Sequence, residues 1–289
     1  LYKQQYRLVG NHSVVKVCFW TKECVREKNK VCYKEHFYDI HCGNCLEMSP
    51  AITCNQRCLH CWRDTSVFSS GWTEEIDDPK EIIQGCIEAR RKLMIGFKGN
   101  ENVDLVKFEN YLIPDHAAIS LTGEPCMYPR LPELVDSFFD DFNFRTVFLV
   151  TNGTMPEVLK KFGKDSKHFP TNLYMSLEAF DSDSYQKFNN PVSTDTWNNI
   201  QESMKYLSTI KDKTKLLYLK TDFKIDDYAT DLIKKIIINN KKSELKIIGK
   251  NELNKTKEKI IYPLSAFYKD IILLSHFILN KKIEFDNII

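Results

Sequence analysis

The chain has 289 residues, of which 43% are hydrophobic and 28% are charged. It is long enough for one large α/β domain or two smaller ones, and its core needs no disulfides. We find no apolar run long enough to span a bilayer and no signal peptide, so we expect a cytoplasmic protein without a membrane partner. All ten cysteines lie in the first half of the chain, which indicates a local site rather than general cross-linking.

Past residue 50, short β-rich runs alternate with longer helical patterns, which is typical of a parallel sheet with helical crossovers. We expect an α/β fold with a partial (β/α)6 barrel over residues 51–250, a cysteine-rich N-terminal extension over 1–50 and a helical segment over 251–289. The predicted strands are Ala51–Cys54, His116–Leu121, Thr146–Thr151, Leu173–Leu177, Lys215–Lys220 and Leu245–Ile248. The predicted helices are Pro79–Phe97, Leu131–Asp141, Pro156–Phe162, Asp181–Phe188, Asp195–Ile210, Asp227–Ile238 and Leu264–Leu279.

Three cysteines, Cys54, Cys58 and Cys61, follow the first predicted strand on one short loop. A cubane iron-sulfur cluster held by three thiolates keeps one iron open for another ligand. The spacing CxxxCxxC resembles the signature of radical S-adenosylmethionine (SAM) enzymes, in which the open iron binds the amino and carboxylate groups of SAM. The alternative is a zinc site, which needs a fourth Cys or His nearby; His60 lies inside the motif.

Polar residues and a glycine follow the next strands, at the edge of a parallel sheet where ligands gather. Gly123 allows a ligand to approach the backbone closely, and the Glu124 carboxylate can accept from the ammonium group of SAM. The predicted SAM-binding residues are Ser120, Gly123, Glu124, Asn152 and Ser176.

Several motifs together resemble those of the tRNA 4-demethylwyosine synthase family of radical SAM enzymes, over roughly residues 1 to 230. Beyond the cysteine loop and its Trp62-Arg63, they are Val17–Trp20, Cys32–Lys34, Asn44–Pro50, Phe97–Gly99, Ser120–Pro125 and Val150–Gly153. The sequence departs from the family at Glu178, where the family has Asp, and over Glu244–Lys250.

The resemblance implies two 4Fe-4S clusters, the second held by three cysteines upstream of the SAM motif. Here these are Cys18, Cys32 and either Cys42 or Cys45, of which we choose Cys45 because the residues after it keep the family's register. It also implies that Lys34, two positions after Cys32, is a catalytic nucleophile toward a ketone. Near cationic metal and out of bulk water, we expect the pKa of Lys34 to be lowered.

By the same resemblance, the reaction condenses pyruvate with N1-methylguanosine-37 of tRNA-Phe to form the tricyclic base 4-demethylwyosine. A separate flavodoxin- or ferredoxin-like protein would donate the electron. Two alternatives remain: another radical SAM enzyme with an auxiliary cluster, such as a glycyl-radical activase, and a non-catalytic zinc RNA-binding module.

The distribution of charge does not decide whether this chain binds RNA. Residues 201–289 contain 18 lysines and 12 acidic residues, although the whole chain has a net charge of only +2. A lysine-rich region fits a polyanionic partner such as RNA. A general bias toward lysine, asparagine and isoleucine explains it equally well, so the region alone does not establish nucleic-acid binding.

Overall fold

In the part of the chain that the computed structural model describes, eight strands form one sheet, in the order of the chain. The structure describes residues 5–26, 31–38, 40–61, 63, 65, 68, 71–72, 75–177, 179, 181–210, 213–221 and 271–275. The strands are β1 (Arg7–Val9), β2 (Ser13–Lys16), β3 (Cys45–Ser49), β4 (His116–Ile119), β5 (Thr146–Thr151), β6 (Asn172–Ser176), β7 (Lys215–Thr221) and β8 (Ile271–Ser275).

Parallel pairing is confined to the centre of this sheet, from β3 to β7. Strands β1 and β2 extend one side and β8 the other, all by antiparallel pairing. Each strand pairs with its neighbour in the chain, and helices connect the parallel ones. The predicted α/β fold is thus confirmed, with antiparallel strands added at both edges.

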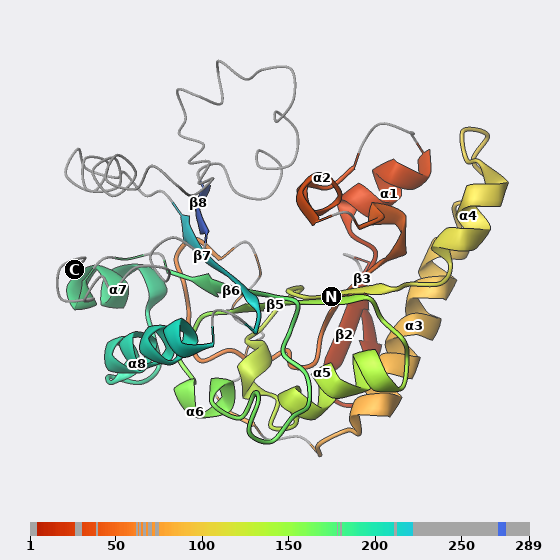
Figure 1. Ribbon diagram of the computed structural model, residues 1–289. Coiled ribbons are helices and arrows are strands. Elements are labelled where there is room, and N and C mark those ends of the chain that lie inside the picture. The colour runs from red at the N-terminus through yellow and green to blue at the C-terminus, as the bar shows by residue number, and fades with distance from the viewer. Residues whose placement is uncertain are drawn as a thin grey trace, which may run out of the picture.

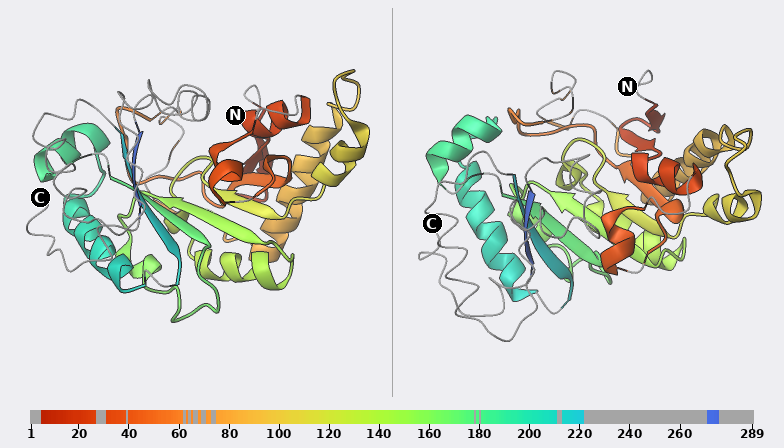
Figure 2. Two further views of the ribbon diagram at one scale, coloured as in Figure 1. Left: turned by 45° about the horizontal axis from the view of Figure 1, so that its top comes forward. Right: turned by 90° about the horizontal axis from the view of Figure 1, so that it is seen from above.

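Helices lie on both sides of the sheet (Figures 1 and 2). Helices α3, α5, α6 and α8 run along its outer side, whereas α1 and α2 lie across the other. The helices are α1 (Phe19–Arg26), α2 (Tyr33–Tyr38), α3 (Pro79–Ile95), α4 (Leu105–Tyr111), α5 (Leu131–Asp140), α6 (Pro156–Leu159), α7 (Ser182–Asn189) and α8 (Thr196–Thr209), with short 3-10 turns η2 (Cys42–Asn44) and η4 (Pro125–Met127). No helix in these ranges is both long and apolar enough to cross a membrane.

Local signals explain why helices begin where they do. The Asp78 side chain accepts a hydrogen bond from the backbone N–H of Lys80, and Pro79 occupies the first helical position of α3. Asp104 caps α4 in the same way, and Asp181 caps α7. These caps satisfy N–H groups that the first helical turn cannot pair internally.

Successive side chains along the parallel strands point alternately to the two faces of the sheet. Apolar side chains of one face form the main core with α3 and α5: Leu46, Met48, Ala117, Ile119, Val147, Leu149, Leu173 and Met175. The intervening residues therefore point to the opposite face. We call this the inner face; its members include Cys45, Glu47, His116, Phe148, Val150, Asn172 and Tyr174.

Two predicted elements are wrong where the structure describes them. Residues 51–54 form a loop, and the first parallel strand is instead Cys45–Ser49, inside the range predicted as an extension. Ile271–Ser275 is a strand, although the sequence predicts a helix over 264–279. The predicted strand Leu245–Ile248 and helix Asp227–Ile238 lie outside the described residues, as do Glu178 and Trp62.

Candidate active site at the strand ends

The three cysteines of the CxxxCxxC loop, called here the cysteine triad, line a pocket at the carboxyl ends of the parallel strands. Its volume is about 770 Å³, open solvent included. The structure brings the triad together there with every residue predicted to bind SAM: Ser120, Gly123, Glu124, Asn152 and Ser176. We call this the strand-end pocket.

Gly123 fits the turn after β4 against the backbone that leads into the triad. Its φ is +67°, and a Cβ at this position would lie 2.3 Å from the Ala51 carbonyl oxygen and 2.7 Å from that of Thr53. The N–H of Glu124 also donates to the Thr53 carbonyl, at 2.8 Å. Only glycine combines this backbone conformation with so close an approach.

The Glu124 carboxylate connects β4 to β5. It is 2% exposed and accepts hydrogen bonds from the Thr151 hydroxyl (2.6 Å), the Asn152 N–H (2.7 Å) and the Cys126 N–H (3.0 Å). Burial raises the pKa of Glu124, although these donors favour the charged form. Because three donors already engage the carboxylate, the binding of an ammonium group by Glu124 stays a prediction.

An amide network that the sequence analysis missed links the triad loop to the end of β5. The Asn152 amide donates to Asn55 Oδ1 at 2.9 Å, and Asn55 donates to the Thr154 hydroxyl at 2.7 Å. Asn152 and Thr154 are closed into one turn by hydrogen bonds of 2.7 and 3.1 Å. Asn55 lies between two motif cysteines, but its partner lies 97 positions away, so no local signal identifies the pair.

The other side of the loop is held by the end of α7. Backbone N–H groups of Arg57 and Leu59 donate to the carbonyls of Asn189 and Phe188, at 3.1 and 2.8 Å. The Asn189 amide also lies 3.6 Å from the Cys58 sulfur. The triad is therefore fixed from two sides, by β5 and by α7.

Four further thiols gather beneath α1 and α2, and they include the three predicted ligands of a second cluster. The Cys42 thiol contacts Cys18 and Cys32; its hydrogen bonds lower the pKa of both, that of Cys18 to about 6. Cys45 interacts with Cys18 and Cys32 through charge, and burial raises its pKa to about 12. The structure thus brings Cys18, Cys32 and Cys45 together, with the alternative ligand Cys42 among them.

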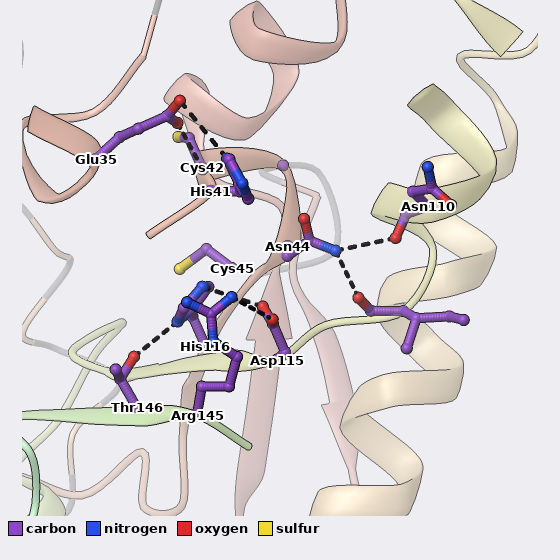
Figure 3. A network of polar contacts seen from close by, with 12 residues as sticks. Glu35, His41, Cys42, Asn44, Cys45, Asn110, Asp115, His116, Arg145 and Thr146 are labelled. Carbon is purple, nitrogen blue, oxygen red and sulfur yellow. Dashed lines mark hydrogen bonds and ion pairs between the residues drawn. The ribbon is translucent and has the colours of Figure 1, made fainter. Parts of the chain in front are cut away.

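Polar contacts position the turn that carries Cys42 and Cys45 (Figure 3). The Cys42 N–H donates to the Glu35 carboxylate of α2 at 2.7 Å. The Asn44 amide donates to the carbonyls of Asn110 and Ile113, at 2.9 and 2.7 Å. The thiol-bearing turn is therefore attached to α2 on one side and to the end of α4 on the other.

Arg90 of α3 is the most unusual residue near these thiols, because it is fully buried and donates only to backbone. Its guanidinium contacts the carbonyls of Cys45 (2.9 Å), Tyr111 (2.8 Å) and Gly43. Burial lowers the pKa of Arg90 to about 10, against the opposing charges of Cys45, Cys18 and Cys42. A buried cation needs negative charge nearby, and several thiolates bound to iron would supply it.

Lys34 of α2 lies against the inner face, with its Nζ 5.3 Å from the centroid of the Phe148 ring. Val150, two residues further along β5 on the same face, lines the strand-end pocket. Two residues of a strand span about 6–7 Å. The amine and the strand-end pocket therefore share one face of one strand.

In the chain without iron, the pKa of Lys34 is raised rather than lowered, so the lowering expected near a metal stays a prediction. Burial does disfavour the charged amine, but the negative forms of Cys45, Tyr33 and Cys32 outweigh it, and the pKa lies above its ordinary value. Nearby metal charge and burial both lower the pKa of a lysine, whereas the negative charge of surrounding thiolates raises it. An iron core bound to these thiolates would cancel part of that negative charge.

In the described part of the chain, neither cysteine group forms a ready site for a single metal ion. Zinc needs four ligands that converge on one point. Within the described ranges, no three His, Cys, Asp or Glu side chains converge closely enough to hold one ion, although His60 lines the strand-end pocket with the triad. Thiolates of a cluster bind different irons and need not converge in this way.

Residues 48–220 match the radical SAM superfamily, and they make up more than half of the chain. The chain therefore belongs to the radical SAM superfamily, whose members bind SAM and a 4Fe-4S cluster.

Its relatives include enzymes named S-adenosyl-L-methionine-dependent tRNA 4-demethylwyosine synthase. The protein of Pyrococcus abyssi is 43% identical over 212 residues, which are 73% of this chain and 60% of that protein. The Homo sapiens protein, TYW1, is 34% identical over 215 residues, which are 74% of this chain and 28% of that protein. The chain thus spans about 60% of the length of its archaeal relative. The predicted family resemblance is confirmed.

Two solved structures of TYW1 also resemble this chain. A structure of TYW1 with a lysine-pyruvate adduct bound superposes with a TM-score of 0.70 at 25% identity and covers 98% of this chain and 96% of that one. A crystal structure of archaeal TYW1 superposes with a TM-score of 0.65 at 24% identity and shares the fold. Together these matches favour this family over the activase and zinc-module alternatives.

Proposed function

We propose that this chain is a tRNA 4-demethylwyosine synthase, which condenses pyruvate with N1-methylguanosine-37 of tRNA-Phe. The observation that carries the proposal is that the inner face of β5 borders two places suited to chemistry. One is the strand-end pocket with its cysteine triad, and the other is the half-buried Lys34, whose amine interacts with the thiols of Cys18, Cys32 and Cys45. The names of the relatives support the same activity.

The residues of the strand-end pocket would hold SAM and its cluster. Cys54, Cys58 and Cys61 would bind the 4Fe-4S cluster, and the turn at Gly123 would present backbone to the methionine part of SAM. Ser120, Glu124, Asn152 and Ser176 would contact its polar groups. When bound, the cluster and SAM supply a carbon radical that can abstract hydrogen.

The second site would bind the small substrate. Cys18, Cys32 and Cys45 would hold a second 4Fe-4S cluster, and Arg90 would balance part of the thiolate charge. Lys34 would then form an imine with pyruvate, as the lysine-pyruvate adduct bound in the TYW1 relative suggests. Two pyruvate carbons join the base, and the carboxylate carbon is lost.

The target base must reach the strand-end pocket from a structured tRNA loop, so it has to leave its stack. Arg63 lines the pocket and is suited to contact the RNA there. Lys98, another basic residue of the family motifs, instead pairs with Glu109 at 2.6 Å and lines no part of the pocket. A separate flavodoxin- or ferredoxin-like protein would supply the electron, in the cytoplasm.

Two measurements test the proposal. Anaerobic reconstitution should give about eight irons per chain for two 4Fe-4S clusters. Cys45→Ser should lose the second cluster and Cys42→Ser should keep it, whereas the reverse pattern would assign Cys42 as the ligand. A value near four irons in wild-type protein would remove the second cluster.

Borohydride reduction with labelled pyruvate should mark wild-type protein but not Lys34→Ala. The exposed Lys164→Ala serves as the matched control and should be labelled like wild type. Conversion of tRNA containing N1-methylguanosine, with SAM, dithionite and pyruvate, tests the complete reaction. Absence of the tricyclic base under these conditions would refute the assigned activity.

A further inference from the structure

A buried amide lies against the sulfur of Cys58 in the cysteine triad. Asn189, the last residue of α7, is fully buried, and its Nδ2 lies 3.6 Å from Cys58 Sγ. The same nitrogen lies 3.4 Å from Oε1 of Gln56, a residue that is 2% exposed. An amide nitrogen carries two hydrogens, so one can serve each contact. The Asn189 amide is therefore placed to donate to the sulfur of a predicted cluster ligand.

Contacts with Gln56 and with the triad loop fix the direction of this amide. Gln56 donates through its side-chain nitrogen to the Tyr185 hydroxyl, so its oxygen faces Asn189. An oxygen in that position needs a donor, and only the nitrogen side of the Asn189 amide can donate. The backbone carbonyl of Asn189 also accepts from the Arg57 N–H at 3.1 Å. Main chain and side chain of Asn189 thus both contact the loop that carries Cys58.

Loss of the Cys58 proton would strengthen the contact with Asn189. In the structure the Cys58 thiol donates to Gln56 Oε1 at 3.1 Å. A cysteine that binds iron is a thiolate, so its sulfur has no proton to donate and can only accept. The Asn189 N–H then faces a negatively charged sulfur, and hydrogen bonds to charged partners are roughly twice as strong as neutral ones.

We propose that Asn189 raises the reduction potential of the cluster held by the triad, by donating an N–H···S hydrogen bond to Cys58. Hydrogen bonds to cysteine sulfurs are among the factors that set iron-sulfur potentials. On reduction, the separate donor protein loses one electron and the cluster gains it, while no proton is transferred. The cluster becomes more negative by one charge, and a hydrogen-bond donor stabilises the more negative form more strongly. Asn189 is a positioning residue that acts through Cys58, and this inference rests on the proposed binding of the cluster by the triad.

The test is a redox titration of the reconstituted full chain, followed by the electron paramagnetic resonance signal that changes when SAM is added. This response separates the triad cluster from the second cluster. Asn189→Leu keeps a similar volume but removes the donor. It should lower the ratio of reduced to oxidised cluster roughly 10-fold at a fixed potential, which equals about 59 mV for one electron. Gln186→Leu, the same loss of an amide at an exposed position of α7, is the matched control and should titrate like wild type.

A second variant decides the outcome if Asn189→Leu does not bind the cluster. Asn189→Ala also removes the donor, but it shrinks the side chain instead of replacing it with one of similar volume, and it should lower the same ratio. An unchanged potential in the variant that binds the cluster, or an equal shift in Gln186→Leu, would overturn the inference. Loss of the cluster from both Asn189 variants would assign Asn189 a purely structural role, which overturns it as well.

Cys58→Ala distinguishes failure of this inference from failure of the proposed function. This variant lacks one ligand of the triad, so it should lose the signal that responds to SAM. If wild-type protein shows no such signal, or if Cys58→Ala keeps it unchanged, the triad does not hold the cluster and the proposed function itself fails. If Cys58→Ala loses the signal while Asn189→Leu titrates like wild type, only the role of Asn189 is refuted.

Discussion

Replacement of Arg90 by methionine should destabilise the cluster-free chain more than any exposed substitution on the same helix. The guanidinium donates to three backbone carbonyls, of Gly43, Cys45 and Tyr111, and the side chain is fully buried. Methionine fills much of the same volume but donates nothing. The variant therefore leaves three carbonyls without their donor in a region closed to water.

The magnitude follows from these three contacts. Each buried carbonyl that loses its partner costs about 1–3 kcal/mol. Removing the buried positive charge returns part of this, because a desolvated ion costs several kcal/mol. We expect a net loss of about 3–5 kcal/mol, the usual result of removing one member of a buried charged network. For a chain of this size, that corresponds to a fall of roughly 6–20 °C in the unfolding midpoint.

Thermal unfolding of iron-free protein, followed by far-ultraviolet circular dichroism, measures this loss. Arg91→Met is the matched control, because Arg91 is the next residue of α3 and is exposed. It should unfold at the wild-type temperature. If Arg90→Met also unfolds within about 2–4 °C of wild type, equivalent to about 1 kcal/mol, the three carbonyl contacts do not stabilise the fold as argued.

Three other substitutions test the strand-end pocket and the surface. Gly123→Ala should lower the iron content of reconstituted protein, because its positive φ and close approach to backbone push the triad loop away; an undiminished iron content would contradict this. Asn55→Ala removes the bond to Asn152 and should weaken SAM binding roughly 5- to 100-fold in anaerobic titration calorimetry, so an unchanged Kd would exclude the network from the site. Lys80→Ala removes an exposed ion pair with Asp141 and should leave the unfolding midpoint unchanged, whereas a clear drop would show that this pair is more than a surface contact.

Elements with local signals were predictable from the sequence. Strand β5 was predicted at its observed bounds, Thr146–Thr151, because its apolar run is flanked by turn residues. Helix α3 begins at Pro79 as predicted, since Asp78 and Pro79 mark its start. The convergence of five strand-end residues also followed from the sequence, because parallel strands end at one edge of a sheet.

Features that depend on distant contacts were not predictable. Residues 51–54 have the composition of a strand, but their carbonyls instead face Gly123 in a loop. Arg90 looked like an ordinary helical arginine, and its burial depends on carbonyls 21 to 47 positions away.

The shared face of β5 constrains how this enzyme can diverge. Side chains on one face of a strand recur every second residue, so Phe148 beneath the amine and Val150 beside the strand-end pocket are locked in the same phase. Inserting one residue between Phe148 and Val150 would move one of these two side chains to the opposite face of the sheet, where the main core lies. The distance along β5 between the Lys34 amine and the strand-end pocket can therefore change only in increments of two residues, about 6–7 Å. Related enzymes that bind larger or smaller molecules in the strand-end pocket should therefore differ in the loops around this pocket, while β5 keeps its length.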